Sequence, residues 1–296
     1  MNTTERVKVT VVGGGYNYSH VDKLVTEEYP RWRSEHIQFV HEDTDVRMYF
    51  DYPFSAEDPV LKPAKCSIAV LEEPYFVVPE FNHFIYHNSH LFDVVYTNQP
   101  GLLDLGRPNI RFYPGGWANI SPQDSRMYEK SGMISAIFSQ KNYAEGHKLR
   151  QQIRNDLFFR GHSCVTFVNS DPHVENSYMD KVSLISPYRF NIAIENEFNT
   201  LFTQQLIDCF LTGTIPIYKG SKRINEYFNM KGIILFDTIE ELRDIANVIL
   251  VIGEQMYNAK LQARQENLEI AKRLTNVGDI LWTHGLEDIL KQKGVI

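Results

Sequence analysis

The segment from Tyr188 to Ser221 constrains the fold more than any other part of this 296-residue chain. It opens with an apolar, β-rich run that ends at Glu195 and Asn196, and it continues into a run whose apolar residues recur at helical spacing. Thr203 stands where such a helix needs its N-cap, and a glycine and a second short strand ending at Lys219 follow. A strand-helix-strand unit of this kind places its two strands parallel in one sheet.

Polar side chains follow both strands of this unit, at Glu195, Asn196, Lys219 and Ser221. In parallel sheets, ligands bind beyond the carboxyl ends of the strands. The four side chains are therefore expected to converge on a ligand at that edge of the sheet.

The same segment resembles the donor-binding motif of the α-1,3-fucosyltransferase family, in its soluble bacterial or viral type. The resemblance rests on the order of Tyr188, Phe190, Asn191, Glu195-Asn196, Thr203, Ile207-Asp208, Ile215-Pro216-Ile217-Tyr218 and Gly220-Ser221. It extends to Arg150, Ile153 and Leu157, which match the family's R-x-x-F-x-x-x-L spacing. It implies a nucleotide diphosphate sugar as donor, with Arg150 as a ligand of the diphosphate, whose oxygens suit a planar guanidinium. A solvated basic helix face is the alternative for Arg150.

The chain departs from that motif where the family usually reads T-E-K, because Gln204 and Gln205 follow Thr203 here. In the family these positions contact the donor sugar and its diphosphate. Lys219, where family members often carry an apolar or aromatic residue, is a candidate to restore the charge missing at Gln205. GDP-fucose stays slightly ahead as the predicted donor, and UDP-xylose, which offers fewer groups to recognise, is the rival.

In the N-terminal half, short strands are predicted at Val7 to Val12, Ile37 to Val40 and Cys66 to Leu71. Glu72 and Glu73 follow the last of these. Adjacent carboxylates at a strand end repel each other, and partial burial raises the pKa of at least one, which suits a general base. A glutamate near this place also resembles the family's catalytic base. Two surface glutamates before a loop are an equally good interpretation of either one alone.

Two features of this half suggest contacts on the acceptor side. Gly14 and Gly15, in the turn after the first strand, would let an acceptor approach the backbone, and Trp117 offers an indole face on which a sugar ring could stack, or belongs to the core. A dinucleotide fingerprint would need a third glycine where Tyr18 stands. A dinucleotide-dependent oxidoreductase, with Glu42 ending the second strand, remains a lesser alternative.

Two patterns could be mistaken for metal sites. Asp43 and Asp45 form a D-x-D with polar flanks, for which a solvated loop is the better interpretation, and His83, His87 and His90 lie on a predicted amphipathic helix. We therefore expect no divalent metal and no cofactor.

The composition narrows the protein class and the compartment. A formal charge of −7 argues against a partner that is nucleic acid or an anionic membrane. Three widely spaced cysteines fit a reducing compartment, and no run of about eighteen apolar residues occurs. The sequence predicts a cytoplasmic protein without a membrane span.

Strands alternating with helices on both sides of a polar linker predict an α/β fold with two Rossmann-like lobes facing a cleft, of GT-B type. The expected lobes are 1–125, on the acceptor side, and 126–296, which binds the nucleotide sugar. The expected function is an inverting, metal-independent transfer of a sugar to an oligosaccharide or glycoprotein glycan. A non-catalytic glycan-binding protein remains an alternative, because the T-E-K carboxylate and lysine are missing.

Overall fold

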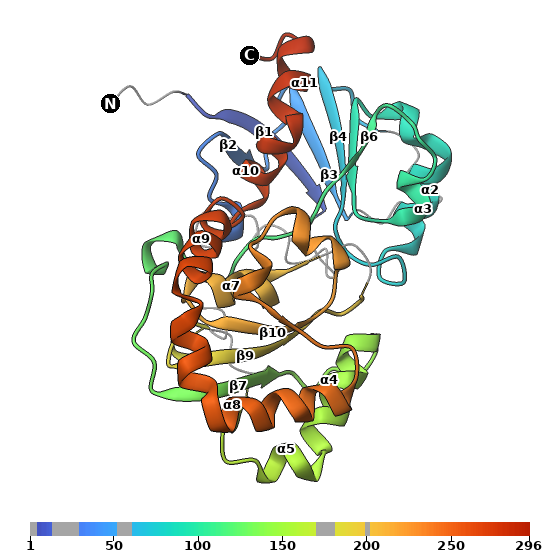
Figure 1. The fold of residues 1–296 in the computed structure, drawn as a ribbon. Helices are drawn as coiled ribbons and strands as arrows, with labels where there is room; N and C mark the ends of the chain where they lie inside the picture. Colours follow the sequence, from blue (N-terminus) through green and yellow to red (C-terminus); the bar gives the residue numbers. More distant parts are fainter. Residues whose placement is uncertain (1–4, 14–29, 52–60, 170–180, 199–201) are drawn as a thin grey trace. The chain divides into compact units, whose positions relative to one another are not determined.

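The computed structural model describes residues 5–13, 30–51, 61–169, 181–198 and 202–296. The chain divides into two compact units. Unit 1 comprises Met1–Gly115 and Asn276–Ile296, and unit 2 comprises Gly116–Thr275. Each unit contains one β-sheet whose strands all run parallel in the described part of the chain (Figure 1).

The sheet of unit 1 has the strand order β2-β1-β3-β4-β5-β6. Its core is formed by apolar side chains of the strands β3, β4 and β5 and of the helices α2 and α3. The elements before residue 115 are β1 (Val7–Gly13), η2 (Pro30–Trp32), β2 (Ile37–Val40), β3 (Val46–Phe50), β4 (Cys66–Leu71), α2 (Pro79–Asn88), η3 (Ser89–Leu91), β5 (Val94–Thr97), α3 (Pro100–Leu103) and β6 (Ile110–Phe112).

The end of the chain returns to unit 1 (Figure 1) as α10 (Val277–Leu281), the π-helical turn η7 (Trp282–Leu286) and α11 (Glu287–Gln292). The Asp279 carboxylate accepts hydrogen bonds from the Ser34 hydroxyl at 2.5 Å and the Glu35 N–H at 3.0 Å. These contacts, together with the stacked rings of His36 and Trp282, tie the last helices to the first unit. The second compact unit therefore ends at Thr275, whereas the lobe expected from the sequence ran to residue 296.

The sheet of unit 2 has the order β11-β10-β9-β7-β8, and the long helix α8 packs along it (Figure 1). Side chains of all five strands and of α8 contribute to one core cluster. The elements of unit 2 are η4 (Pro122–Asp124), β7 (Gly132–Phe138), α4 (Glu145–Asn155), α5 (Leu157–Gly161), β8 (Val165–Asn169), α6 (Lys181–Ile185), β9 (Tyr188–Ile194), α7 (Gln204–Leu211), β10 (Ile215–Lys219), η5 (Lys222–Glu226), η6 (Met230–Gly232), β11 (Ile234–Leu235), α8 (Ile239–Ala259) and α9 (Leu261–Lys272).

The predicted strand-helix-strand unit is confirmed. β9 and β10 pair in parallel, with Ile215 opposite Phe190 and Lys219 opposite Ile194. Thr203 is the N-cap of α7, because its hydroxyl oxygen accepts a hydrogen bond from the Gln205 N–H. Beyond α7 the backbone of Gly213 has a φ of +66°, a conformation that glycine adopts without strain.

The polar segment expected to link the lobes is part of unit 2, because its backbone and side chains are bonded there. The Arg126 N–H donates to the Leu211 carbonyl at 2.9 Å, and the buried Asp208 carboxylate accepts from the backbone and side chain of Asn119. Burial raises the pKa of Asp208 to about 6. The units therefore divide between Gly115 and Gly116, earlier than the predicted boundary at 125.

Lys130 anchors the end of this segment. Its ammonium donates to the carbonyls of Ser186 and Thr212, both at 2.8 Å, and to the Thr214 hydroxyl at 2.9 Å. Burial lowers the pKa of Lys130 to about 7. In the unfolded chain the same ammonium keeps its proton up to about pH 10.5.

We expect this lysine to make the stability of the protein depend on pH. Between about pH 7 and 10.5 the unfolded state binds one more proton than the folded state, so the free energy of unfolding rises by about 1.4 kcal/mol per pH unit over this window. The gain is absent below pH 7, where both states hold the proton. Urea unfolding of the wild type and of Lys130→Met at pH 7.5 and 9.5 measures this contribution. Parallel pH profiles of the two proteins would show that folding does not lower the pKa of Lys130.

Candidate functional site

The carboxyl edge of the sheet in unit 1 carries a cluster of carboxylates. Asp51 follows β3, and Glu72 and Glu73 follow β4. The Asp51 Oδ1 atom accepts hydrogen bonds from the backbone N–H of Glu72 at 2.8 Å and of Glu73 at 3.1 Å. The two strand ends are thereby held together, with the predicted base candidates at their centre.

Glu72 and Glu73 differ in their surroundings. The Glu72 side chain is buried, and its Oε2 atom lies 2.6 Å from a guanidinium nitrogen of Arg31. Arg31 in turn lies over the rings of Trp32 and Phe50. Glu73 is half-buried. The Glu73 side chain is therefore the more accessible of the two, and the arginine stabilises the negative charge of Glu72.

Asp51 is the member of the cluster that sequence reasoning missed. Its pKa is raised well above the ordinary value by burial and then by the charges of Glu73 and Glu72. Its φ of +43° is a strained conformation for a residue with a side chain, of the kind that concentrates at functional sites. The available signal was the run VRMYF before Asp51, a five-residue strand that is apolar except for Arg47 and ends at an acid.

The buried Tyr113, directly after β6, completes this edge of unit 1. Its hydroxyl finds no hydrogen-bond partner in the part of the chain that the structure describes. Burial, followed by the charge of Glu72, raises the pKa of this phenol well above its usual value, so it remains a proton donor. The cluster thus combines carboxylates with a neutral hydroxyl.

The carboxyl edge of the sheet in unit 2 is organised around Glu195, which is 1% exposed. Its Oε1 atom accepts from the Thr203 N–H at 2.9 Å and from the Tyr218 hydroxyl at 3.3 Å, and its Oε2 atom accepts from the Thr203 hydroxyl at 2.6 Å. Burial raises the pKa of Glu195, and the Thr203 bonds oppose that shift. Glu195 therefore positions the start of α7.

Arg150 lies beside this carboxylate. Its guanidinium donates to the Ile194 carbonyl and, at 3.1 Å, to the Asn196 Oδ1 atom. Burial lowers the pKa of Arg150 to about 10, so the group stays charged at neutral pH. The structure thus brings Arg150, Glu195 and Asn196 together at the end of β9.

The helix that carries Arg150 is held close to the same strand end by Gly146. The Gly146 N–H donates to the Asn196 carbonyl at 3.0 Å, and a Cβ atom at Gly146 would lie 1.7 Å from the Glu195 carbonyl oxygen. Only glycine permits this approach. No local pattern in the sequence indicates this requirement.

The remaining predicted donor residues surround this network. The Lys219 ammonium donates to the Asp237 carbonyl at 2.9 Å and lies over the Phe198 ring. Ser221 is buried and caps η5 by accepting from the Arg223 N–H. Gln204 and Gln205 are half-buried in the first turn of α7.

Of the three predicted acceptor-side residues, only Trp117 has a described placement. Gly14 and Gly15 lie outside the described residues. Trp117 falls in unit 2, although it was expected in the first lobe, and its φ is +46°. The preceding Gly115 and Gly116 also have positive φ.

The structure supports neither of the two patterns considered as metal sites within the residues that it describes. Asp43 pairs with Arg47 and Asp45 with Lys65, and both carboxylates precede β3, at the edge of the sheet opposite to the carboxylate cluster. Among the residues with a described placement, no group of three or more His, Cys, Asp or Glu side chains could hold a metal ion. Within the same residues, no helix is long and apolar enough to cross a bilayer.

Comparison with known proteins identifies the fold. No family profile and no curated sequence matches the chain. Among solved structures, it is similar to an α1,3-fucosyltransferase at 16% identity and a TM-score of 0.59, over 98% of this chain and 92% of the other. A structure of an α1,3-fucosyltransferase with GDP matches at 17% identity and a TM-score of 0.54, over 93% and 92%. Anabaena HepE in complex with UDP and glucose matches at 10% identity and a TM-score of 0.56, over 97% and 100%.

These similarities span nearly the whole chain and both units. Two α/β units with parallel sheets are the architecture of GT-B glycosyltransferases, so the predicted fold class is confirmed. At these identities the likeness shows the fold alone. The activity must be argued from the residues.

Proposed function

We propose that this protein is a glycosyltransferase that moves a sugar from a nucleotide diphosphate sugar to a glycan hydroxyl, with inversion and without a metal ion. The observation that carries the proposal is the buried Arg150-Glu195-Asn196 network at the end of β9, on a fold shared with an α1,3-fucosyltransferase. Unit 2 binds the donor, and unit 1 provides the acceptor side and the base.

On the donor side, Arg150 supplies positive charge for the leaving diphosphate, and Lys219 at the end of β10 adds to it. Both cations are held by backbone carbonyls, so little reorganisation is needed when an anion binds. Glu195 holds Thr203, the N-cap of α7, which leaves the amides of Gln204 and Gln205 to contact the sugar.

On the acceptor side, we assign the base to Glu73, with Glu72 as a positioning residue. The acceptor oxygen forms a bond to the anomeric carbon, the bond from that carbon to the diphosphate oxygen breaks, and the hydroxyl proton passes to the Glu73 carboxylate. The charge of Glu73 contributes to the raised pKa of the neighbouring Asp51, so these two carboxyl groups belong to one electrostatic cluster.

For the donor we favour GDP-fucose, with UDP-xylose as the rival. The solved neighbours include one structure with GDP and one with UDP and glucose, so both nucleotides occur on this fold. The neutral Gln204 and Gln205 recognise fewer charged groups than a glutamate and a lysine would. The matching residues around Gln204 and Gln205 support fucose as the transferred sugar. The two glutamines themselves, in place of the family's glutamate and lysine, support xylose.

A thermal-shift screen of GDP-, UDP- and dTDP-sugars tests donor binding. A donor at a hundred times its dissociation constant stabilises the folded state by about 2.7 kcal/mol. We expect a GDP-sugar to raise the melting temperature most, and GDP and fucose offered separately are the controls. A screen without any shift would contradict the donor site.

A further inference from the structure

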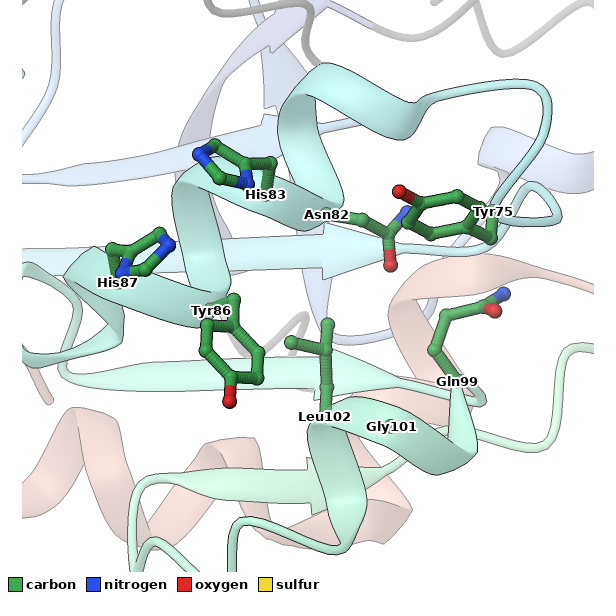
Figure 2. A pocket seen from close by; sticks show the side chains of 8 residues that line it. All are labelled: Tyr75, Asn82, His83, Tyr86, His87, Gln99, Gly101 and Leu102. Carbon is green, nitrogen blue, oxygen red and sulfur yellow. The ribbon is translucent and has the colours of Figure 1, made fainter.

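Unit 1 contains a pocket of about 440 Å³ that the mechanism above does not use (Figure 2). It lies between α2, α3 and the loop that follows β4. Two tyrosines line it, Tyr75 from the loop and Tyr86 from α2, and their side chains are 59% and 46% exposed. Its volume falls within the usual range for small-molecule sites.

The polar groups of the pocket come mainly from α2. Asn82 is 4% exposed, and its Nδ2 atom donates to the Val78 carbonyl at 3.0 Å, which fixes the direction of the amide. His83 and His87 lie one turn apart, with ring centroids 4.6 Å from each other. Figure 2 shows Asn82 between the two tyrosines. Fixed amides and imidazoles among aromatic rings suit hydroxyl groups, which both donate and accept.

The charge of the pocket restricts its ligand. The lining residues that the structure describes include no Asp, Glu, Lys or Arg. A phosphate, sulfate or carboxylate would enter without a counter-charge, which is costly. The pocket therefore favours a neutral, hydroxyl-rich molecule with apolar faces that can lie on tyrosine rings.

The pocket adjoins the carboxylate cluster. Gln99 lines it, and the Gln99 Nε2 atom donates to the Glu73 carbonyl at 3.2 Å and to the Asn98 Oδ1 atom at 2.8 Å. Tyr75 follows Glu73 by two residues. One wall of the pocket is therefore built on the backbone that carries the assigned base.

We propose that this pocket binds a neutral hexopyranose ring of the acceptor glycan, with Tyr75 and Tyr86 against its apolar faces. This inference rests on the proposed function, because it takes Glu73 to act on an acceptor held nearby. It specifies the acceptor as an uncharged sugar.

Gly101 provides a direct test. It lines the pocket, and a Cβ atom built on it meets nothing within 4 Å, so the fold accommodates Gly101→Leu, whose side chain we expect to occupy part of the pocket. Gly161 in unit 2 is equally open, and Gly161→Leu is the matched control. Saturation-transfer NMR with the methyl glycosides of galactose, glucose and mannose, and with methyl glucuronide as a charged counterpart, measures binding without any donor.

We expect the wild type and Gly161→Leu to bind at least one neutral glycoside, and Gly101→Leu to bind it roughly tenfold more weakly or not at all. Donor hydrolysis should be equal in all three proteins. Unchanged binding by Gly101→Leu, a preference for the glucuronide, or no binding by the wild type would overturn the inference. Glycoside binding that Gly101→Leu abolishes, in a protein that hydrolyses no donor, would support the pocket and reject the proposed activity.

Discussion

Replacing Glu73 by glutamine is expected to lower turnover by about a hundredfold or more, because the amide keeps the shape of the side chain but cannot accept the acceptor proton. Donor binding should survive, since Glu73 lies in unit 1 and the proposed donor residues lie in unit 2. Steady-state transfer rates and donor calorimetry measure the two effects separately.

Three further variants make this result specific. Glu35→Gln, at an exposed position of the same unit, is the control and should turn over normally. Glu72→Gln removes the counter-ion of Arg31 and should lower the stability as well as the rate. Full turnover by Glu73→Gln would remove it as the base, and a selective loss in Asp51→Asn would then transfer the role to Asp51.

Replacing Arg150 by lysine is expected to weaken donor binding by roughly ten- to a hundredfold, the equivalent of losing a charged hydrogen bond of about 1.5 to 3 kcal/mol. Lysine keeps the charge but lacks the planar fork that allows one side chain to bond the Ile194 carbonyl, the Asn196 side chain and a phosphate together. Calorimetric titration with the donor gives the affinity.

The exposed Arg160 in α5 offers the matched substitution, and Arg160→Lys should leave donor affinity unchanged. Circular dichroism and urea unfolding establish whether Arg150→Lys remains folded. An affinity equal to that of the wild type in a folded Arg150→Lys protein would place the diphosphate elsewhere.

Local patterns were sufficient for much of the fold. The run from Tyr188 to Ser221 combines a strong apolar period, an N-cap and a glycine stop, and all of its elements form as predicted. β3 was missed because the charged Arg47 interrupts the apolar run of its five residues. In the folded chain the Arg47 side chain is buried and pairs with Asp43. The return of 276–296 to unit 1 depends on contacts such as Ser34 with Asp279, which no local pattern records.

The site was predictable in its residue types and less so in their roles. Strand ends identified Glu72, Glu73, Glu195 and Lys219, because carboxyl ends of parallel strands share an edge. Their partners depend on tertiary packing. That Glu195 holds Thr203 and Tyr218, and that Asp51 joins the glutamates, follows from distances across the sheet that only the folded chain fixes.

Nucleotide release tests the central claim most directly. The purified protein is incubated with GDP-fucose or UDP-xylose, each with and without EDTA, and the released nucleoside diphosphate is measured for the wild type and for Arg150→Lys. The account predicts release by the wild type, faster from GDP-fucose, unchanged by EDTA and reduced in the variant. Faster release from UDP-xylose would change the donor and leave the glycosyltransferase activity standing. No release from either sugar nucleotide, with or without acceptor glycan, would contradict it.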